Sequence, residues 1–273
     1  DRAIAAMLEQ GAFGDAGHEI LVEEFMDGEE LSVFALCDGS GACVMQGAQD
    51  YKRLLDADSG PNTGGMGAYS PVSFDTLAVH QDIVQSLIQP TLAALVDAGA
   101  PFTGLLYAGV MLTGSGPKVV EFNCRFGDPE TETLMPLMLS SLLEPVAAVA
   151  RGESLAAVEP FRWSDGASVT TVVAEAGYPD SPRSGDVIDF PEPEDNVYVF
   201  HAGTRVAEDW RPTPEADPRV VTAGGRVLAI TAVGATLAAA AASSRGYAER
   251  VRFDGKQMRS DIGARELARL RNA

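Results

Sequence analysis

The stretch VVEFNCRFGDPETETLMP, residues 119–136, opens with the pattern of a β-strand and closes with that of a helix. A strand projects alternate side chains to one face, so Glu121, Asn123 and Arg125 are predicted to point the same way. The apolar side chains of Val120 and Phe122 are expected to pack into a core behind that face. A carboxylate, an amide and a guanidinium group would then line one side of this strand.

The next residues mark the expected start of the helix. Asp128 fits a helix N-cap, and Pro129 fits the favoured first helical position. On its own, the pair Glu121 and Asn123 also suits a solvated sheet face. Together with Arg125, Asp128 and a helix N-terminus it is typical of a site for Mg²⁺ and phosphate groups, and both interpretations stay open at this point.

The composition is that of a folded protein. The chain has 273 residues, of which 46% are hydrophobic, which is enough for a sizeable core and for two domains. The sequence contains no uninterrupted apolar run of about 18 residues, so no membrane-spanning helix is predicted. The opening DRAIAAMLEQ lacks the basic and apolar regions of a signal peptide. The net charge of −19 argues against a nucleic-acid partner or an anionic membrane.

The cysteines and histidines show no metal-binding spacing. Cys37, Cys43 and Cys124 are scattered, and the three histidines form no zinc motif. An odd number of cysteines without a signal peptide indicates reduced thiols, so a cytoplasmic location is predicted.

The first part of the chain is predicted to mix strands and helices. Asp-Gly pairs at 27–28 and 38–39 predict hairpin turns between the first three strands. A helix kinked at Pro90 is expected over 75–98, and a second helical region contains Pro136 and runs to about residue 150. The predicted strands cover residues 19–25, 30–37, 42–49, 104–112 and 118–123.

The pattern then changes to short strands separated by Gly and Pro, with one Ala-rich helix over 236–250. This predicts a second, smaller, β-rich domain, so domains of residues 1–158 and 159–273 are expected. The loop at 208–219 is polar and is expected to be exposed. The predicted strands cover residues 168–174, 186–190, 197–204, 219–224 and 226–234.

Three other stretches carry candidate binding residues. LVEEFMDGEELSV (21–33) fits either a hairpin with charged tips or a hinge whose backbone binds adenine while a glutamate binds ribose. GPNTGGMGAYSP (60–71) fits either a flexible loop or backbone amides around an anion, and it is neither a P-loop nor a dinucleotide fingerprint. AQDYKR (48–53) fits either a solvated turn or a mixed-charge site for an amino acid.

Taken in order, these stretches resemble the glycinamide ribonucleotide synthetase (phosphoribosylamine–glycine ligase) family of ATP-grasp enzymes. The resemblance spans almost the whole chain. It implies an α/β (α+β) fold: an ATP-grasp C-terminal lobe with an antiparallel sheet, plus a small β-rich C-terminal domain. The matching motifs are VEEFMDGEELSV, QDYKR, GPNTGGMGAYSP, TGLLYAGVM, EFNCRFGDPETE, GYPDSPRSGDVI, VFHAGT and VVTAGGRVLAITAVG.

The resemblance implies an ATP-dependent ligation in purine (IMP) biosynthesis. Glycine would react with ATP to give glycyl phosphate, and 5-phosphoribosylamine would displace phosphate to give glycinamide ribonucleotide. The cofactors implied are ATP and Mg²⁺ or Mn²⁺. The strand before the metal strand, GLLYAGVM, carries no acid, so the ion would have few protein ligands.

The resemblance also implies roles for individual residues. Those expected to hold the metal are Glu121 and Asn123. Those expected to bind ATP are Glu23, Phe25 and Met26 at the adenine hinge and Glu30 at the ribose. Those expected to act in catalysis are Arg125 and Asp128. Those expected to bind glycine or phosphoribosylamine are Asp50, Lys52, Asn62, Thr63, Gly64, Gly65, Gly67 and Arg125.

One departure from the family affects the expected activity. The chain is expected to start inside the last helix of the ATP-binding lid and thus to be a C-terminal portion, whose partner is the N-terminal portion of the same enzyme. No nucleic-acid or membrane partner is expected, and the complete enzyme is expected to be a monomer. Two alternatives remain: another ATP-grasp carboxylate–amine ligase, or an inactive fragment or partner subunit.

Overall fold

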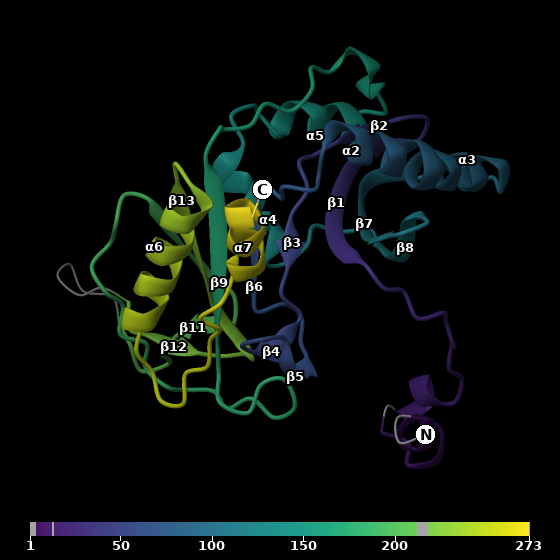
Figure 1. Ribbon diagram of the computed structural model, residues 1–273. Coiled ribbons are helices and arrows are strands. Elements are labelled where there is room, and N and C mark those ends of the chain that lie inside the picture. The colour runs from purple at the N-terminus through teal and green to yellow at the C-terminus, as the bar shows by residue number, and fades with distance from the viewer. Residues whose placement is uncertain (1–3, 13, 212–217, 273) are drawn as a thin grey trace.

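Two antiparallel sheets organise the chain, and the computed structural model describes residues 4–12, 14–211 and 218–272 (Figure 1). One sheet has four strands in the order β2-β1-β7-β8, and the other has five in the order β10-β13-β9-β6-β3. Each of two further hairpins, β4–β5 and β11–β12, forms a two-stranded sheet. The predicted α/β (α+β) class with antiparallel sheets is confirmed.

The four-stranded sheet contains the hairpin predicted at 38–39 and a second hairpin made by the strands predicted over 104–112 and 118–123, whereas the hairpin predicted at 27–28 does not form. The turn at Asp38 leads from β1 to β2, and its carboxylate accepts hydrogen bonds from the amides of Ser40 and Gly41 at 2.8 and 2.7 Å. The second hairpin joins β7 to β8, as predicted. The strands of this sheet are β1 (Glu29–Asp38), β2 (Ala42–Val44), β7 (Thr103–Thr113) and β8 (Gly116–Asn123).

The five-stranded sheet combines strands from both parts of the chain. At its centre, β9 pairs with β13 on one side and with β6 on the other. Gly67 is needed there, because a Cβ atom would lie 2.5 Å from the carbonyl oxygen of Thr170. The division at 158–159 stays a prediction. The strands are β3 (Gln49–Asp50), β6 (Gly67–Ser70), β9 (Ala167–Ala174), β10 (Val197–His201) and β13 (Arg226–Gly234).

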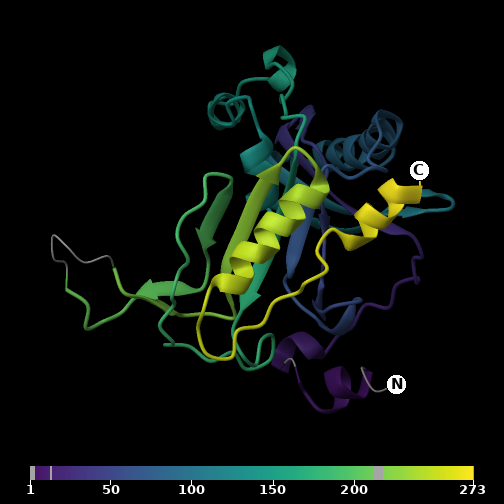
Figure 2. The same cartoon turned by 60° about the vertical axis from the view of Figure 1, so that its left-hand side comes forward.

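Helices cover the sheets (Figure 2). The predicted helix over 75–98 is confirmed as three continuous pieces, with a π-helical turn before Pro90. The predicted helix over 236–250 is confirmed as α6, which packs on β9 and β13 and is capped by the Thr236 hydroxyl. The bounds are α2 (Leu77–Ile83), η3 (Val84–Ile88), α3 (Gln89–Asp97) and α6 (Leu237–Arg250).

The helical region around Pro136 ends near residue 150, as predicted, but it is interrupted between Leu137 and Leu143. Residues 138–139 leave the helix because they pair instead with residues 162–163. The C-terminal helix α7 was not predicted. The remaining elements are η1 (Ala5–Glu9), η2 (Gly14–Gly17), β4 (Arg53–Leu55), β5 (Ser59–Asn62), α4 (Glu130–Leu134), η4 (Met135–Leu137), α5 (Leu143–Ala150), η5 (Leu155–Ala157), β11 (Thr204–Val206), β12 (Val220–Thr222) and α7 (Ala264–Asn272).

Three other predictions about elements were wrong. Residues 19–25 form no strand. The hairpin partner expected for them was β1, but both edges of β1 are already occupied, one by β7 and the other by β2 and the Ser32–Ala48 bridge. Residues 186–190 make only two isolated bridges. The glycine-rich stretch, expected to be a loop, contributes β5 and β6. The central residues of the 208–219 loop, 212–217, lie outside the described residues.

The main hydrophobic core lies between the two sheets and the helices. It joins Leu31 and Val33 of β1 and Ile88 of the helical segment to Val169 of β9 and Leu237 of α6. Tyr51, which directly follows β3, and Phe122 of β8 pack in the same core, next to candidate site residues. Among the described residues, no helix has both the length and the apolar character needed to cross a bilayer.

Candidate active site

Two neighbouring cavities contain most of the predicted site residues. The first, of about 380 Å³, is called the Glu30 cavity, and its lining includes Glu30, Asn62, Met111 and Val120. The second, of about 140 Å³, is called the Arg125 cavity, and its lining includes Thr63, Gly64, Glu121, Arg125, Asp128 and Glu130. Asp50 and Lys52 line both cavities, so the short strand β3 and the residues after it form their shared wall.

The metal-strand residues lie at the end of β8. Asn123 donates a hydrogen bond from Nδ2 to Oε1 of Glu121 at 3.1 Å, so their side chains share one side of the strand, as predicted. Alternation fails at Val120, because a β-bulge lies between Val119 and Glu121. Val120 was expected in the core, and it lines the Glu30 cavity beside Met111 instead.

Asp50 is the most deeply buried acid of the shared wall. Its exposed fraction is 8%. Burial, and then the nearby Glu130 carboxylate, raise the pKa of Asp50 to about 7, although Lys52 acts in the opposite direction. Burial lowers the pKa of Lys52, but Asp50 and Glu30 outweigh it and the net pKa is raised. Lys52 also forms an ion pair with Glu30, so it stays a cation at the junction of the cavities.

Glu130 is a site residue that the sequence did not reveal. Only 3% of it is exposed, and its carboxylate accepts hydrogen bonds from the hydroxyls of Tyr107 at 2.7 Å and Ser32 at 3.2 Å. Tyr107 and Ser32 lie on the neighbouring strands β7 and β1. In the sequence Glu130 is one of several acids at a helix start, so nothing in its spacing separates it from its neighbours.

Asp128 does not cap the helix, contrary to prediction. Helix α4 begins at Glu130, Pro129 occupies the cap position, and no side-chain capping bond forms. The Asp128 carboxylate is held instead by Arg226 Nη1 at 3.1 Å. Helix α4 has only five residues, so its N-terminus has a small dipole and is a weak site for a phosphate group. Arg125 is the exposed cation of this turn.

The amides of the glycine-rich loop are not free to surround an anion. The amides of Thr63, Gly64, Gly65 and Met66 donate to protein acceptors, respectively the Lys52 carbonyl, the Tyr178 hydroxyl, the Thr63 hydroxyl and the Tyr51 carbonyl. Thr63 and Gly64 still line the Arg125 cavity. Gly67 lies inside β6, paired with Thr171, and lines neither cavity.

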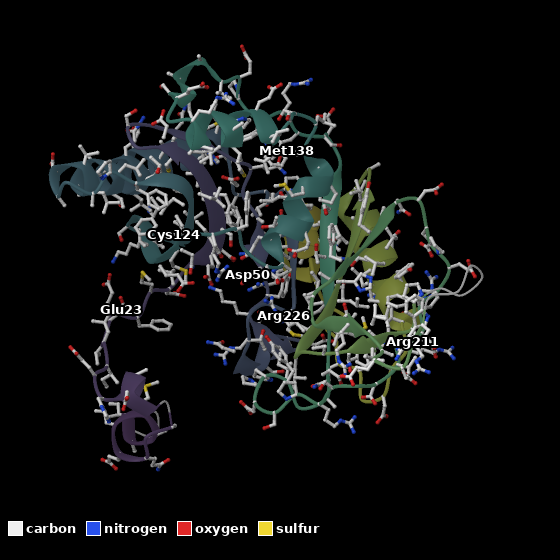
Figure 3. All side chains as sticks on the ribbon, turned by 180° about the vertical axis from the view of Figure 1, so that it is seen from behind. Glu23, Asp50, Cys124, Met138, Arg211 and Arg226 are labelled. Atoms are coloured by element: carbon white, nitrogen blue, oxygen red, sulfur yellow. The ribbon has the colours of Figure 1, made fainter. Side chains whose placement is uncertain are left out.

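The residues expected at the adenine hinge are not at these cavities. Glu23, Phe25 and Met26 lie in the irregular segment before β1, and Phe25 is 92% exposed. Figure 3 shows Glu23 on this segment, apart from Asp50 and Arg226. The alternation of apolar and polar residues over 19–25 favoured a strand, but a strand also requires a neighbouring strand with which its backbone can form hydrogen bonds, and these residues have no such pairing in the structure.

A family model of an ATP-grasp domain matches the part of the chain that provides most of the lining of these cavities, which places the protein in the ATP-grasp class. The family model described as "Phosphoribosylglycinamide synthetase, ATP-grasp (A) domain" matches residues 1–131, and the model of the "C domain" of the same synthetase matches residues 168–265. The chain belongs to the phosphoribosylglycinamide synthetase family.

Individual relatives agree with this assignment. A phosphoribosylamine–glycine ligase of Caulobacter vibrioides is 46% identical over 98% of this chain and 61% of its own length. The crystal structure of such a ligase from Thermotoga maritima is 33% identical, with a TM-score of 0.80 over 96% of this chain and 63% of that chain. The chain therefore spans about three fifths of the length of the curated relatives it matches.

A more distant structure shares the fold alone. It is the biotin carboxylase domain of the Hydrogenobacter thermophilus 2-oxoglutarate carboxylase. That domain is 12% identical, with a TM-score of 0.59 over 94% of this chain and 53% of that chain. It was crystallised in complex with the magnesium salt of ADP and with bicarbonate.

Proposed function

We propose that the chain provides the substrate- and metal-binding part of an enzyme that joins glycine to 5-phosphoribosylamine at the expense of ATP. The observation that supports this most directly is the Arg125 cavity, where Asp50 and Glu121 face the cations Lys52 and Arg125. A small zwitterion such as glycine needs an acid for its ammonium group and a cation for its carboxylate. Membership of the family supports the choice of glycine and phosphoribosylamine.

Asp50 is the proposed acceptor for the ammonium group of glycine. Burial and then the Glu130 carboxylate raise the pKa of Asp50, and a bound cation would favour its charged form against both effects. Arg125 is the proposed partner of the carboxylate, because a guanidinium group presents two parallel N–H donors to a carboxylate or an acyl phosphate. Asp128 keeps its predicted catalytic role, and Thr63 and Gly64 their predicted substrate roles, as part of the proposal, because all three line the Arg125 cavity. Asn62 lines the Glu30 cavity, and Gly65 and Gly67, which line neither, would contribute only through the shape of the loop.

The Glu30 cavity is the proposed nucleotide side. Glu30 would accept hydrogen bonds from ribose hydroxyls, and the apolar side chains of Met111 and Val120 would contact the base. Lys52, at the junction, would balance phosphate charge. Glu23, Phe25 and Met26 stay the proposed hinge. Reaching a nucleotide would require them to approach this cavity.

The end of β8 suits a divalent metal ion. Glu121 provides a carboxylate and Asn123 an amide oxygen, a hard-oxygen set for Mg²⁺ or Mn²⁺, and the hydrogen bond from Asn123 Nδ2 to Glu121 Oε1 keeps the two side chains together. No larger group of metal-binding acids, histidines or cysteines exists among the described residues, so phosphate oxygens and water would complete the shell. The ion, when bound, would neutralise the charge of the transferring phosphoryl group.

In the proposed reaction, a carboxylate oxygen of glycine attacks the γ-phosphorus of ATP, and the bond to the β-γ bridging oxygen breaks to release ADP. The amine of phosphoribosylamine then attacks the acyl carbon of glycyl phosphate, phosphate leaves, and the amine loses a proton. Arg125 would stabilise the charge that develops on the acyl phosphate. Lys52 and Asp50 would keep glycine oriented between the cavities.

We also propose action as a monomer in the cytoplasm, within purine (IMP) biosynthesis. Cys37, Cys43 and Cys124 are all unpaired thiols, which suits a reducing compartment. The acidic balance, with 39 acidic against 20 basic residues, suits small-molecule partners better than nucleic acid.

The proposal is tested by measuring ADP release with ATP, Mg²⁺, glycine and 5-phosphoribosylamine. The chain is assayed alone, and again with the unmatched part of the Caulobacter relative supplied as a second polypeptide. We expect ADP release that requires both substrates in at least one preparation. If neither preparation requires glycine, or if another carboxylic acid replaces it with higher kcat/KM, the proposed function is wrong.

A further inference from the structure

Two side chains from distant parts of the sequence hold the same residue of the glycine-rich loop, Gly64, one at each of its two flanking peptide groups. The hydroxyl of Tyr178 accepts a hydrogen bond from the amide of Gly64 at 2.9 Å. The guanidinium group of Arg226 donates from Nη1 to the carbonyl oxygen of Gly64 at 2.8 Å. The two polar groups of Gly64 are thus bound from the side of the five-stranded sheet, more than 100 residues away in the sequence.

The same guanidinium group also binds the turn that follows β8. Arg226 Nη1 donates to the carbonyl oxygen of Asp128 at 2.6 Å and lies 3.1 Å from its carboxylate. The Arg226 side chain is only 21% exposed, so the ion pair is better shielded from water than a surface pair. One side chain therefore joins two walls of the Arg125 cavity, the Gly64 loop and the Asp128 turn.

The surroundings of Arg226 and Tyr178 restrict both side chains. Arg226 is the first residue of β13 and pairs with Ala174 of β9. The ring of Tyr178 packs against Gly225, where an added Cβ atom would lie 2.3 Å from the ring. A Cβ atom at Gly64 would lie 3.2 Å from the guanidinium carbon of Arg226. The contacts are close on each side, so small displacements of the sheet would move the loop.

We propose that Arg226 and Tyr178 are positioning residues for the amino-acid substrate of the Arg125 cavity. They act through Gly64 and Asp128, and neither lines that cavity or the Glu30 cavity. The proposal rests on the proposed function, because it assumes that glycine binds in the Arg125 cavity. The five-stranded sheet then contributes to substrate recognition although it provides no group that contacts the reacting atoms.

The test compares the kinetic constants for glycine, proposed to bind in the Arg125 cavity, with those for ATP, proposed to bind in the Glu30 cavity. It uses the preparation that gives glycine-dependent ADP release and the variants Arg226→Met and Tyr178→Phe. Arg205→Met is the control, because Arg205 is a half-exposed arginine whose ion pair is with the exposed Glu208. We expect kcat/KM for glycine to fall about tenfold or more in both variants, with KM for ATP and the melting temperature close to those of the control.

A double variant separates a shared clamp from two independent effects. Because both side chains hold the backbone of one residue, Gly64, the double variant Arg226→Met with Tyr178→Phe is expected to lose less kcat/KM than the product of the single losses. Tyr178→Phe keeps the packed ring, so it stays informative if Arg226→Met fails to fold.

The outcomes also separate this proposal from the proposed function. If the unmodified protein needs no glycine, the function is wrong. If it needs glycine but the variants change KM for ATP as much as for glycine, or change only the melting temperature, the positioning role is wrong.

Discussion

Asp50 illustrates how burial changes the chemistry of a single residue. An unfolded aspartate has a pKa near 3.9, whereas burial and Glu130 raise the pKa of Asp50 to about 7 in the folded chain. Between these values the folded state binds more protons than the unfolded state. The contribution of Asp50 to the free energy of unfolding is therefore fully present below about pH 4 and is lost as the pH rises through about 7.

The substitution Asp50→Asn should remove this pH dependence. We expect the free energy of unfolding of the unmodified chain to fall between pH 4 and 7, by at most about 1.4 kcal/mol per pH unit, and that of the variant to fall less. Urea unfolding at several pH values measures this. Asp97→Asn, at an exposed helix position, is the control. Equal slopes for Asp50→Asn and the unmodified chain would contradict the buried position of this acid.

Glu121 has the opposite character, because it is exposed and contributes little to packing. Glu121→Gln keeps the size of the side chain but removes the charge that a magnesium site requires. We expect at least about a tenfold loss of turnover and weaker binding of magnesium-ATP, with a melting temperature close to that of the unmodified protein. Glu144→Gln, on the exposed side of α5, is the control. Unchanged magnesium dependence in Glu121→Gln would show that the pair with Asn123 is only structural.

Among the elements, β8 shows how one extra residue changes a strand. The bulge turns Val120 toward the Glu30 cavity while Glu121 lines the Arg125 cavity. A regular strand would place only alternate residues on each side. The bulge thus lets one short strand contribute to both cavities.

The glycine-rich loop depends on one backbone conformation. Gly65 has a φ of +113°, and an added Cβ atom would lie 2.7 Å from Cδ of Pro129. Gly65→Ala is therefore expected to lower the free energy of unfolding by about 1–3 kcal/mol and to reduce kcat/KM for glycine. Chemical unfolding and ADP release measure the two effects. Gly114→Ala is the matched control, since its Cβ atom would meet nothing within 4 Å. Equal stability of the two variants would contradict the close approach of loop and turn.

At the scale of the whole molecule, the two parts of the chain share a sheet and a core. Four residues of β6 pair with β9, and the main core contains residues from before and after position 158. The family models divide the chain by sequence, but the fold connects those segments through backbone hydrogen bonds. The active-site loop is thereby attached to the five-stranded sheet.

Limited proteolysis tests this connection. We expect early cleavage between Arg151 and Trp163, where most residues up to 160 are exposed, or within the 208–219 loop. Fragments cut near residue 158 should stay together in size-exclusion chromatography without denaturant, because separating them would expose β6, β9 and the shared core. Early cleavage in the 104–123 hairpin, or fragments that separate in buffer, would contradict this arrangement.

The sequence by itself determined the family, the class of fold and most of the hairpins and helices. It also predicted Glu121, Asn123, Arg125, Asp50 and Lys52 as site residues, because local alternation and ordered motifs carry that information. Tertiary structure alone decided the bulge at Val120, the partner of Asp128, and the contacts of Glu130 and Arg226. These depend on contacts between residues far apart in the chain. No local pattern encodes which distant strand will pair, and hence which buried acids and bases will meet.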